Sequence, residues 1–221
     1  MAGIKITGNG GVDLEVESNT RAVRTTLRPL DVGALGAYRV AAFSGLTATL
    51  AAGGTVFSLR WTHATNLMVI RYLRVRYAVV TGFTAAQELA FSAFIARTWT
   101  VADSAATNVA LTTNNNKKRT SFGTSLVGAN DCRIAAAVVV TAGTRTLDAN
   151  PVLVGMGKTL AAAATVQDAS FESVMDLTNG VDYPIVCATN EGIVVQNTIL
   201  MGAGGTVRIG VECEWEEVAS Y

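Results

Sequence analysis

The chain has few charged residues, few prolines and one histidine, and these shortages narrow the classes of protein it can belong to. Only 15% of its 221 residues are charged, where about 25% is usual for a soluble domain. Its 17 basic residues are balanced by 17 acidic ones, which argues against a chain that coats nucleic acid or an anionic membrane. Half of the residues are hydrophobic, so we expect part of the surface to be buried against other subunits.

Long apolar runs are also missing. The most apolar stretches, residues 134–140 and 160–166, are far shorter than the roughly 18 to 20 residues needed to span a bilayer. The first residues hold no apolar segment typical of a secretory signal. The sequence therefore predicts neither a membrane partner nor secretion.

Cysteine is scarce and scattered. Cys132, Cys187 and Cys213 form no Cys-x-x-Cys pair. We expect buried free thiols in a reducing cytoplasm, because free cysteine packs as a small hydrophobic residue. Spacing alone leaves a disulfide open.

The residues that catalysis and metal binding require are sparse. The single histidine, His63, directly follows a predicted strand, and no Gly-x-Ser-x-Gly motif is present. A zinc site needs three or four ligands from histidine, cysteine and carboxylate residues. We therefore expect His63 in a turn, no metal, no cofactor and no enzymatic activity.

One short motif resembles a phosphate-binding loop. Residues 157–159 read Gly-Lys-Thr, but such a loop needs a further glycine where Val152 stands. The glycine-rich residues 202–205 lack the third glycine of a dinucleotide fingerprint. We expect a turn at each place.

Alternation with a period of two is the clearest pattern. In residues 207–216 apolar side chains alternate with Arg208 and three glutamates, which is typical of a strand with one buried and one solvated face. Similar alternation marks residues 12–17, 57–62, 67–79 and 89–95, and β-branched runs cover 181–188 and 192–200. In the third of these segments the apolar residues share one parity, interrupted by Arg71. The only helix candidates are short: 159–167, or one turn near 85–88.

Glycine-rich stretches punctuate these runs as turns should. The sequence predicts an all-β chain, a β-sandwich of jelly-roll type over residues 30–221. Residues 1–29 form either an extended N-terminal arm or an ordinary first hairpin. If residues 1–29 form an arm, we expect its apolar residues to bind a neighbouring protein. These residues are Ile4, Ile6, Val12, Leu14 and Val16.

Two groups of basic residues are further candidate interface residues. The run 114–119 ends in Lys117, Lys118 and Arg119, and it predicts either a contact with an acidic neighbour or a solvated loop tip. A second group, Arg71, Arg74 and Arg76, can face the glutamates of residues 212–217, within one subunit or between subunits. Such pairs set register and partner choice more than affinity.

Several segments resemble a group of structural proteins of tailed bacteriophages. The similarity begins near residue 16 and covers most of the chain. The segments that carry it are 35–40 (LGAYRV), 56–61 (VFSLRW), 83–88 (FTAAQE), 119–124 (RTSFGT), 144–150 (TRTLDAN), 190–192 (NEG), 207–209 (VRI) and 215–218 (WEEV). The resemblance implies a virion protein assembled in the host cytoplasm.

Within that group we expect a non-enzymatic capsid decoration or cement protein that stabilises the head by binding between capsomers. Its partners would be copies of itself, for example in a trimer, and the major capsid protein or other virion proteins. A tail or head-fibre component that contacts the host is the alternative. A carbohydrate-binding sandwich and a virion-associated glycan hydrolase remain as rival classes.

Overall fold

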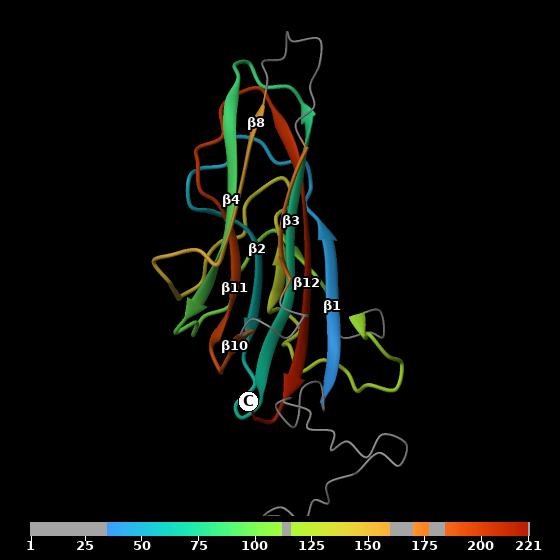
Figure 1. Ribbon diagram of the computed structural model, residues 1–221. Helices are drawn as coiled ribbons and strands as arrows, with labels where there is room; N and C mark the ends of the chain where they lie inside the picture. Colours follow the sequence, from blue (N-terminus) through green and yellow to red (C-terminus); the bar gives the residue numbers. More distant parts are fainter. Residues whose placement is uncertain (1–34, 112–115, 160–169, 177–183, 221) are drawn as a thin grey trace, which may run out of the picture. The chain divides into compact units, whose positions relative to one another are not determined.

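A computed structural model describes residues 35–111, 116–159, 170–176 and 184–220 (Figure 1). The chain divides into two units, Met1–Leu30 and Asp31–Tyr221, and every described residue belongs to the second. The predicted arm, including Ile4, Ile6, Val12, Leu14 and Val16, therefore lies outside the described residues. Among the described residues no helix is long and apolar enough to cross a membrane.

The first antiparallel sheet has five strands. Its order is β1-β12-β3-β10, and β9 also pairs with β3. The strands are β1 (Gly36–Phe43), β12 (Thr206–Val218), β3 (Leu67–Thr81), β10 (Ile185–Cys187) and β9 (Ser170–Asp176).

The second antiparallel sheet has seven strands. Its order is β5-β6-β2-β11-β4-β7, and β8 also pairs with β4. The strands are β5 (Thr107–Asn108), β6 (Cys132–Ile134), β2 (Gly54–Trp61), β11 (Glu191–Asn197), β4 (Gln87–Arg97), β7 (Thr146–Leu147) and β8 (Leu153–Thr159).

The pairing of the main strands is nested. β1 pairs with β12, β2 with β11, β3 with β10 and β9, and β4 with β8. The first half of the chain is thus paired antiparallel with the second half, and successive pairs fall in alternate sheets.

The inner faces of the two sheets form one core. A single buried cluster contains side chains from both sheets, and the rings of Tyr77 on β3 and Phe91 on β4 meet across it with centroids 5.4 Å apart. On the first sheet, Tyr38 of β1 stacks on Trp215 of β12 at 5.8 Å. These contacts confirm the all-β sandwich that the alternation predicted.

The period-two reading holds for β12 and fails for part of β3. Val207, Ile209, Val211, Cys213 and Trp215 are all buried, as predicted. On β3 the residues that face the core change from even-numbered to odd-numbered positions. The cause is a β-bulge, because Glu214 of β12 lies opposite Tyr72 while the next residue, Trp215, lies opposite Ile70. Arg71 is the extra residue of that bulge, so Met68 and Ile70 face the core with Leu73, and Val69 does not belong to the core cluster.

Most glycine-rich connections are turns or bends, with one exception. Gly53, Asn190 and residues 203–204 lie in turns or bends, and Asn190 adopts the left-handed backbone conformation at φ 64° that asparagine tolerates. The turn predicted at residues 157–159 is wrong, because they continue β8 along the edge of the second sheet.

Neither helix prediction is confirmed. Residues 84–85 form a bend and Gln87 already begins β4, so the turn predicted near residues 85–88 is not helical. Thr159 ends β8, and the rest of the other candidate lies outside the described residues.

The three cysteines are free and buried, as expected. Burial, with a smaller contribution from nearby Glu191, raises the pKa of the Cys187 thiol to about 12. The pKa values of Cys132 and Cys213 are raised by the same main cause. The thiols therefore pack as neutral apolar groups.

Candidate interaction surface

The outer face of the five-stranded sheet gathers most of the predicted basic residues. Outward positions of β3 and β12 face each other in register, with Glu212 opposite Arg74 and Gly210 opposite Arg76. On the far side of β3, Glu172 of β9 lies opposite Arg76. We call this surface the charged face.

Ion pairs cross the strands of the charged face. Arg74 Nη2 lies 2.5 Å from Glu212 Oε2 and Arg76 Nη2 lies 2.7 Å from Glu212 Oε1, so one carboxylate bridges two guanidinium groups. A third contact of 3.8 Å joins Arg74 to Glu172. The hydrogen bond to Glu212 raises the pKa of Arg74. Solvent screens partly exposed pairs of this kind, so they fix register more than they stabilise.

The other predicted basic residues pair along the same strands. Arg71, in the bulge, lies 3.9 Å from Glu216, and Lys118 forms an ion pair with Glu214. The sequence left open whether these groups pair within or between subunits. The structure pairs Arg71, Arg74, Arg76 and Lys118 within one chain.

The basic run at 117–119 is attached to β1. Lys117 forms an isolated bridge with Tyr38, and the Lys118 amide donates to the carbonyl of Ala37 at 2.9 Å. The Arg119 guanidinium lies 5.9 Å from the centroid of the Phe122 ring. Lys118 and Arg119 are exposed, so the run lies at the surface but is held by backbone contacts.

Glu217 holds the segment that follows this run. Its carboxylate is fully buried and accepts hydrogen bonds from Ser125 Oγ at 2.6 Å, from the Leu126 amide and from Trp215 Nε1 at 3.2 Å. Burial raises the pKa of Glu217, and these three donors oppose the rise. The group is therefore a structural anchor at the end of β12.

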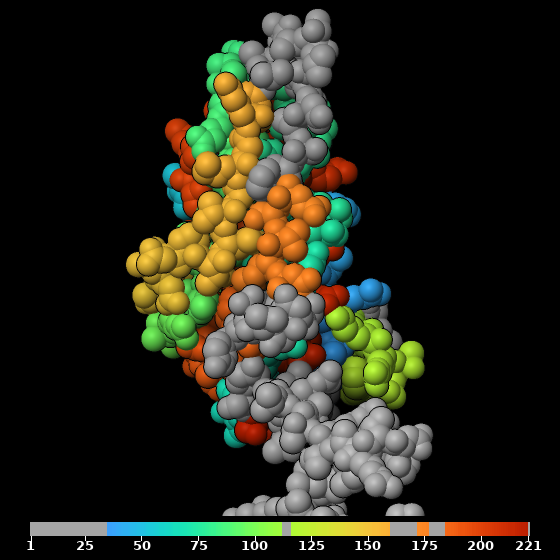
Figure 2. Space-filling view, viewed as in Figure 1, coloured from blue at the N-terminus to red at the C-terminus, as the bar shows by residue number. Residues whose placement is uncertain are grey.

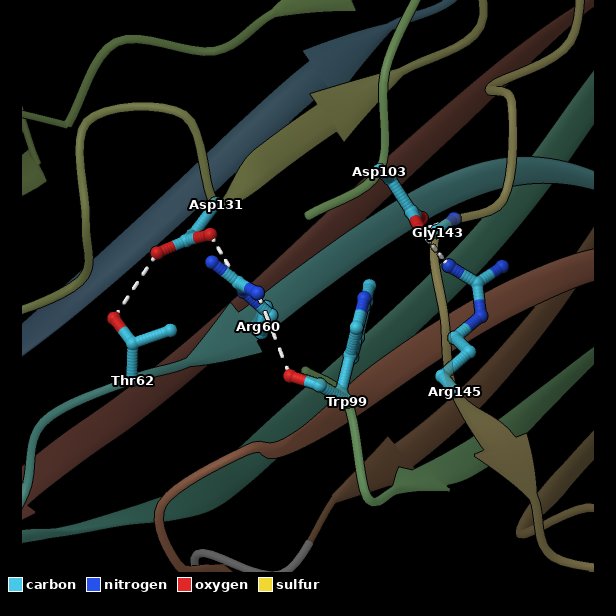
Figure 3. Close-up of polar contacts among 7 residues, drawn as sticks. All are labelled: Arg60, Thr62, Trp99, Asp103, Asp131, Gly143 and Arg145. Atoms are coloured by element: carbon cyan, nitrogen blue, oxygen red, sulfur yellow. Dashed lines mark hydrogen bonds and ion pairs between the residues drawn. The ribbon is translucent and has the colours of Figure 1, made fainter. Parts of the chain in front are cut away.

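The outer side of the seven-stranded sheet is covered by the connection between β4 and β8. A small second cluster packs Trp99 against Ala96 of β4 and Val194 of β11. Two arginine–aspartate pairs, Arg60 with Asp131 and Arg145 with Asp103, fix this connection on either side of Trp99 (Figure 3). The guanidinium of Arg145 also lies 4.7 Å from the Trp99 ring centroid.

Local partners surround these buried pairs, although Oδ2 of Asp103 is buried without a hydrogen-bond partner among the described residues. Asp131 accepts from Arg60 Nε at 2.7 Å and from Thr62 Oγ1 at 3.1 Å. Asp103 accepts from the Gly143 amide at 2.8 Å through the same oxygen that pairs with Arg145. The side chains of Arg145 and Asp103 are only 3% and 2% exposed. Arg145 Nη2 also donates to Thr55 Oγ1 of β2 at 2.8 Å, which ties the connection to the second sheet.

His63 lies in the connection between β2 and β3, directly before a bend at residues 64–65. Its Nδ1 accepts a hydrogen bond from the Asn66 amide at 3.1 Å, and its ring lies 5.9 Å from that of Trp61. Within the described parts of the chain, no group of three or more histidine, cysteine or carboxylate side chains is placed to hold a metal ion.

Strands β8 and β9 bring the edges of the two sheets together. Figure 2 shows them side by side on one face, and Ser173 Oγ donates to the carbonyl of Val154 at 3.0 Å. Three apolar side chains project into solvent here: Val154 and Met156, each 54% exposed, and Val174, 44% exposed. We call this region the β8–β9 edge.

Comparison with known proteins identifies no relative: no family model, no curated protein and no solved structure matches the chain. The fold and the surfaces described above are therefore the basis for any functional inference.

Sequence reasoning missed several residues that shape these surfaces. The pairing of Asp103 with Arg145 and of Asp131 with Arg60 joins residues 42 and 71 positions apart, and no periodic pattern marks such distant partners. The sequence did mark Gly210. Every second residue from Arg208 to Glu216 is charged except Gly210, which has no side chain.

Proposed function

We propose that this chain is a non-enzymatic structural protein of a bacteriophage virion, a capsid decoration or cement protein that binds between capsomers. Copies of the chain form a homo-oligomer, for example a trimer, and the oligomer binds the major capsid protein or other virion proteins. The sequence resemblance suggested this role, and the geometry of the surfaces supports it over a catalytic one.

The observation that carries the proposal is the β8–β9 edge. Among the described residues β8 pairs only with β4 and β9 only with β3, and the side that each strand leaves without a ladder faces the other strand, where Ser173 Oγ donates to the carbonyl of Val154. The exposed apolar side chains of Val154, Met156 and Val174 lie beside the exposed charged residues Lys158 and Glu172 of the same strands. Exposed apolar side chains gathered within a polar rim are typical of a protein–protein interaction site.

The strand order adds support. Nested pairs that alternate between two sheets are what a long hairpin produces when it rolls up into a jelly roll, an architecture common in viral capsid domains. We infer that the sandwich is a jelly roll. Fold alone does not give function, so the order supports the proposal only together with the edge and the low charge.

Quantitative mass spectrometry of purified virions tests the location. A decoration protein is expected in hundreds of copies per particle, because it occupies repeated sites on the shell. A copy number of a dozen or fewer would instead support the tail or head-fibre alternative. Absence of the chain from particles would overturn the virion role.

A substitution at the edge tests the mechanism. Replacing Val154 and Met156 by lysine places two charges on β8 and is expected to shift the protein from oligomer to monomer in analytical ultracentrifugation. It should also abolish binding to purified capsids that lack the chain. Val138→Lys is the matched control, because Val138 is 58% exposed but lies away from this edge. Unchanged assembly of the double variant would exclude the β8–β9 edge as the interface.

A further inference from the structure

A hollow of about 580 Å³ lies at one end of the charged face. Gly210 forms part of its lining. A Cβ atom there would lie 3.0 Å from Cε1 of Phe43 and 3.2 Å from Cγ of Arg76. The missing side chain thus lets Phe43 and Arg76 pack together over Gly210, with the Arg76 guanidinium 5.6 Å from the centroid of the Phe43 ring, and this pair forms one wall of the hollow.

The walls of the hollow are apolar and open to solvent. Phe43, at the end of β1, is 64% exposed, and Val80 of β3 is 54% exposed, and Ala78 is a further apolar residue of the lining. A free small ligand usually enters a site that encloses most of its surface. Walls this exposed suit an apolar side chain presented by the surface of another protein.

The charges around the hollow are not balanced. Arg74, Arg76, Glu212 and Glu172 form one network joined by the contacts at 2.5, 2.7 and 3.8 Å, with two charges of each sign. Arg208 adds a fifth charge to the rim, and within the described part of the chain it forms no ion pair. The hollow therefore has an excess of one positive charge beside an apolar recess.

We propose that this hollow docks a segment of a partner protein in which an apolar side chain stands next to a carboxylate. The apolar side chain fills the hollow, against Phe43, Ala78 and Val80, and the carboxylate pairs with Arg208. An arginine can receive a carboxylate with two parallel hydrogen bonds. This inference concerns a surface separate from the β8–β9 edge, and it stands whether or not the partner is a virion protein.

The first test uses defined peptides and the full-length chain. Three acetylated, amidated probes are titrated: Ser-Asp-Leu-Asp-Ser, its lysine analogue Ser-Lys-Leu-Lys-Ser, and Ser-Asp-Ser-Asp-Ser, which lacks the apolar side chain. The NMR signals of the Val80 methyl groups report binding at the hollow. We expect the first peptide to shift them with a Kd of about 1 mM, and each analogue to bind at least about fivefold more weakly, because it lacks one of the two contacts.

Variants of the protein separate the two contacts. Gly210→Val is expected to abolish the shifts, because its side chain would displace Phe43 and Arg76, which form one wall of the hollow. Arg208→Glu should reverse the preference between the aspartate and lysine peptides. The controls are Ala41→Val and Arg39→Glu, at exposed outward positions of β1 outside the hollow, and both should bind like the unaltered chain.

Three outcomes would overturn the proposal. One is the absence of methyl shifts with every peptide at about 5 mM, which would mean that the hollow is covered in the intact protein or has no affinity for the segment. The second is equal binding of the aspartate and lysine peptides. The third is undiminished binding to a folded Gly210→Val protein, with folding verified by an unchanged near-ultraviolet circular dichroism spectrum.

Discussion

At the scale of single residues, the buried ionisable groups tie segments together. Glu217 anchors residues 125–126 to β12, and Asp103 and Arg145 join two parts of the β4–β8 connection, which a hydrogen bond from Arg145 to Thr55 ties to β2. Each group is enclosed by donors or by an opposite charge. These groups should therefore have measurable effects on stability. The effect of Glu217 depends on pH, and the effect of Asp103 and Arg145 depends on their pairing.

Glu217 should make stability depend on pH. Burial raises its pKa above the ordinary value of 4.5, so the folded chain binds the proton more tightly than the unfolded chain. The favourable contribution of the protonated form is complete below pH 4.5 and is lost as the pH rises towards the raised pKa. Urea unfolding between pH 3.5 and 7 should show this decline in the unaltered protein and not in Glu217→Gln. Glu88→Gln, at an exposed position, should keep it, and identical pH profiles for all three proteins would contradict the assignment.

The buried pair of Asp103 and Arg145 should be costly to break. Asp103→Asn leaves the guanidinium enclosed without its counter-charge, and we expect a loss of about 3 kcal/mol in the free energy of unfolding, measured by urea denaturation. Breaking the more exposed pair of Arg97 and Asp148 by Asp148→Asn should cost less than about 1 kcal/mol. Similar losses for the two variants would mean that enclosure does not control the effect.

At the scale of strands, the bulge on β3 decides which side chains enter the core. Met68 and Ile70 face inward only because Arg71 is an extra residue opposite β12. Deleting Arg71 would turn these two side chains away from the core cluster and Val69, which is buried on the opposite face, towards it, since a shift of one residue reverses the faces of a strand. We expect the deletion variant to lose cooperative unfolding and Arg71→Ala to lose less than about 1 kcal/mol. A deletion variant as stable as Arg71→Ala would show that the register adapts.

The same bulge illustrates what the sequence could predict. Long strands with one solvated face, such as β12, were predicted because each apolar residue alternates with a polar one. Arg71 visibly interrupts the alternation in the sequence. The pattern alone does not show whether Arg71 is an arginine that points outward in a regular strand or the extra residue of a bulge, which exchanges the two faces of the strand. Strands β5, β6 and β7 are only two or three residues long, which is too short for any period to be recognised.

On the charged face, the charge pattern of the sequence predicted part of the observed ion pairing. Arginines on β3 and glutamates on β12 have the same spacing, so their pairing followed from the pattern. The β8–β9 edge and the hollow at Gly210 depend on which strands meet, and strand order has no local signal. Residues 157–159 show the same limit, because a glycine-rich edge strand and a turn have similar composition.

At the scale of the whole molecule, the nested pairing makes the fold depend on its last strand. β12 lies between β1 and β3 in the centre of the first sheet, and five of its side chains enter the core. A sheet closed by such distant partners folds slowly, because loop-closure entropy is lost before the contacts form. A chain truncated after Gly205 should therefore show no cooperative thermal transition by circular dichroism, although it retains the sequences of eleven strands. Truncation after Ser220, which removes only one residue beyond the described part, should leave the transition unchanged. If the shorter chain still unfolded cooperatively, the second sheet would be stable alone and the sandwich would consist of two independent layers.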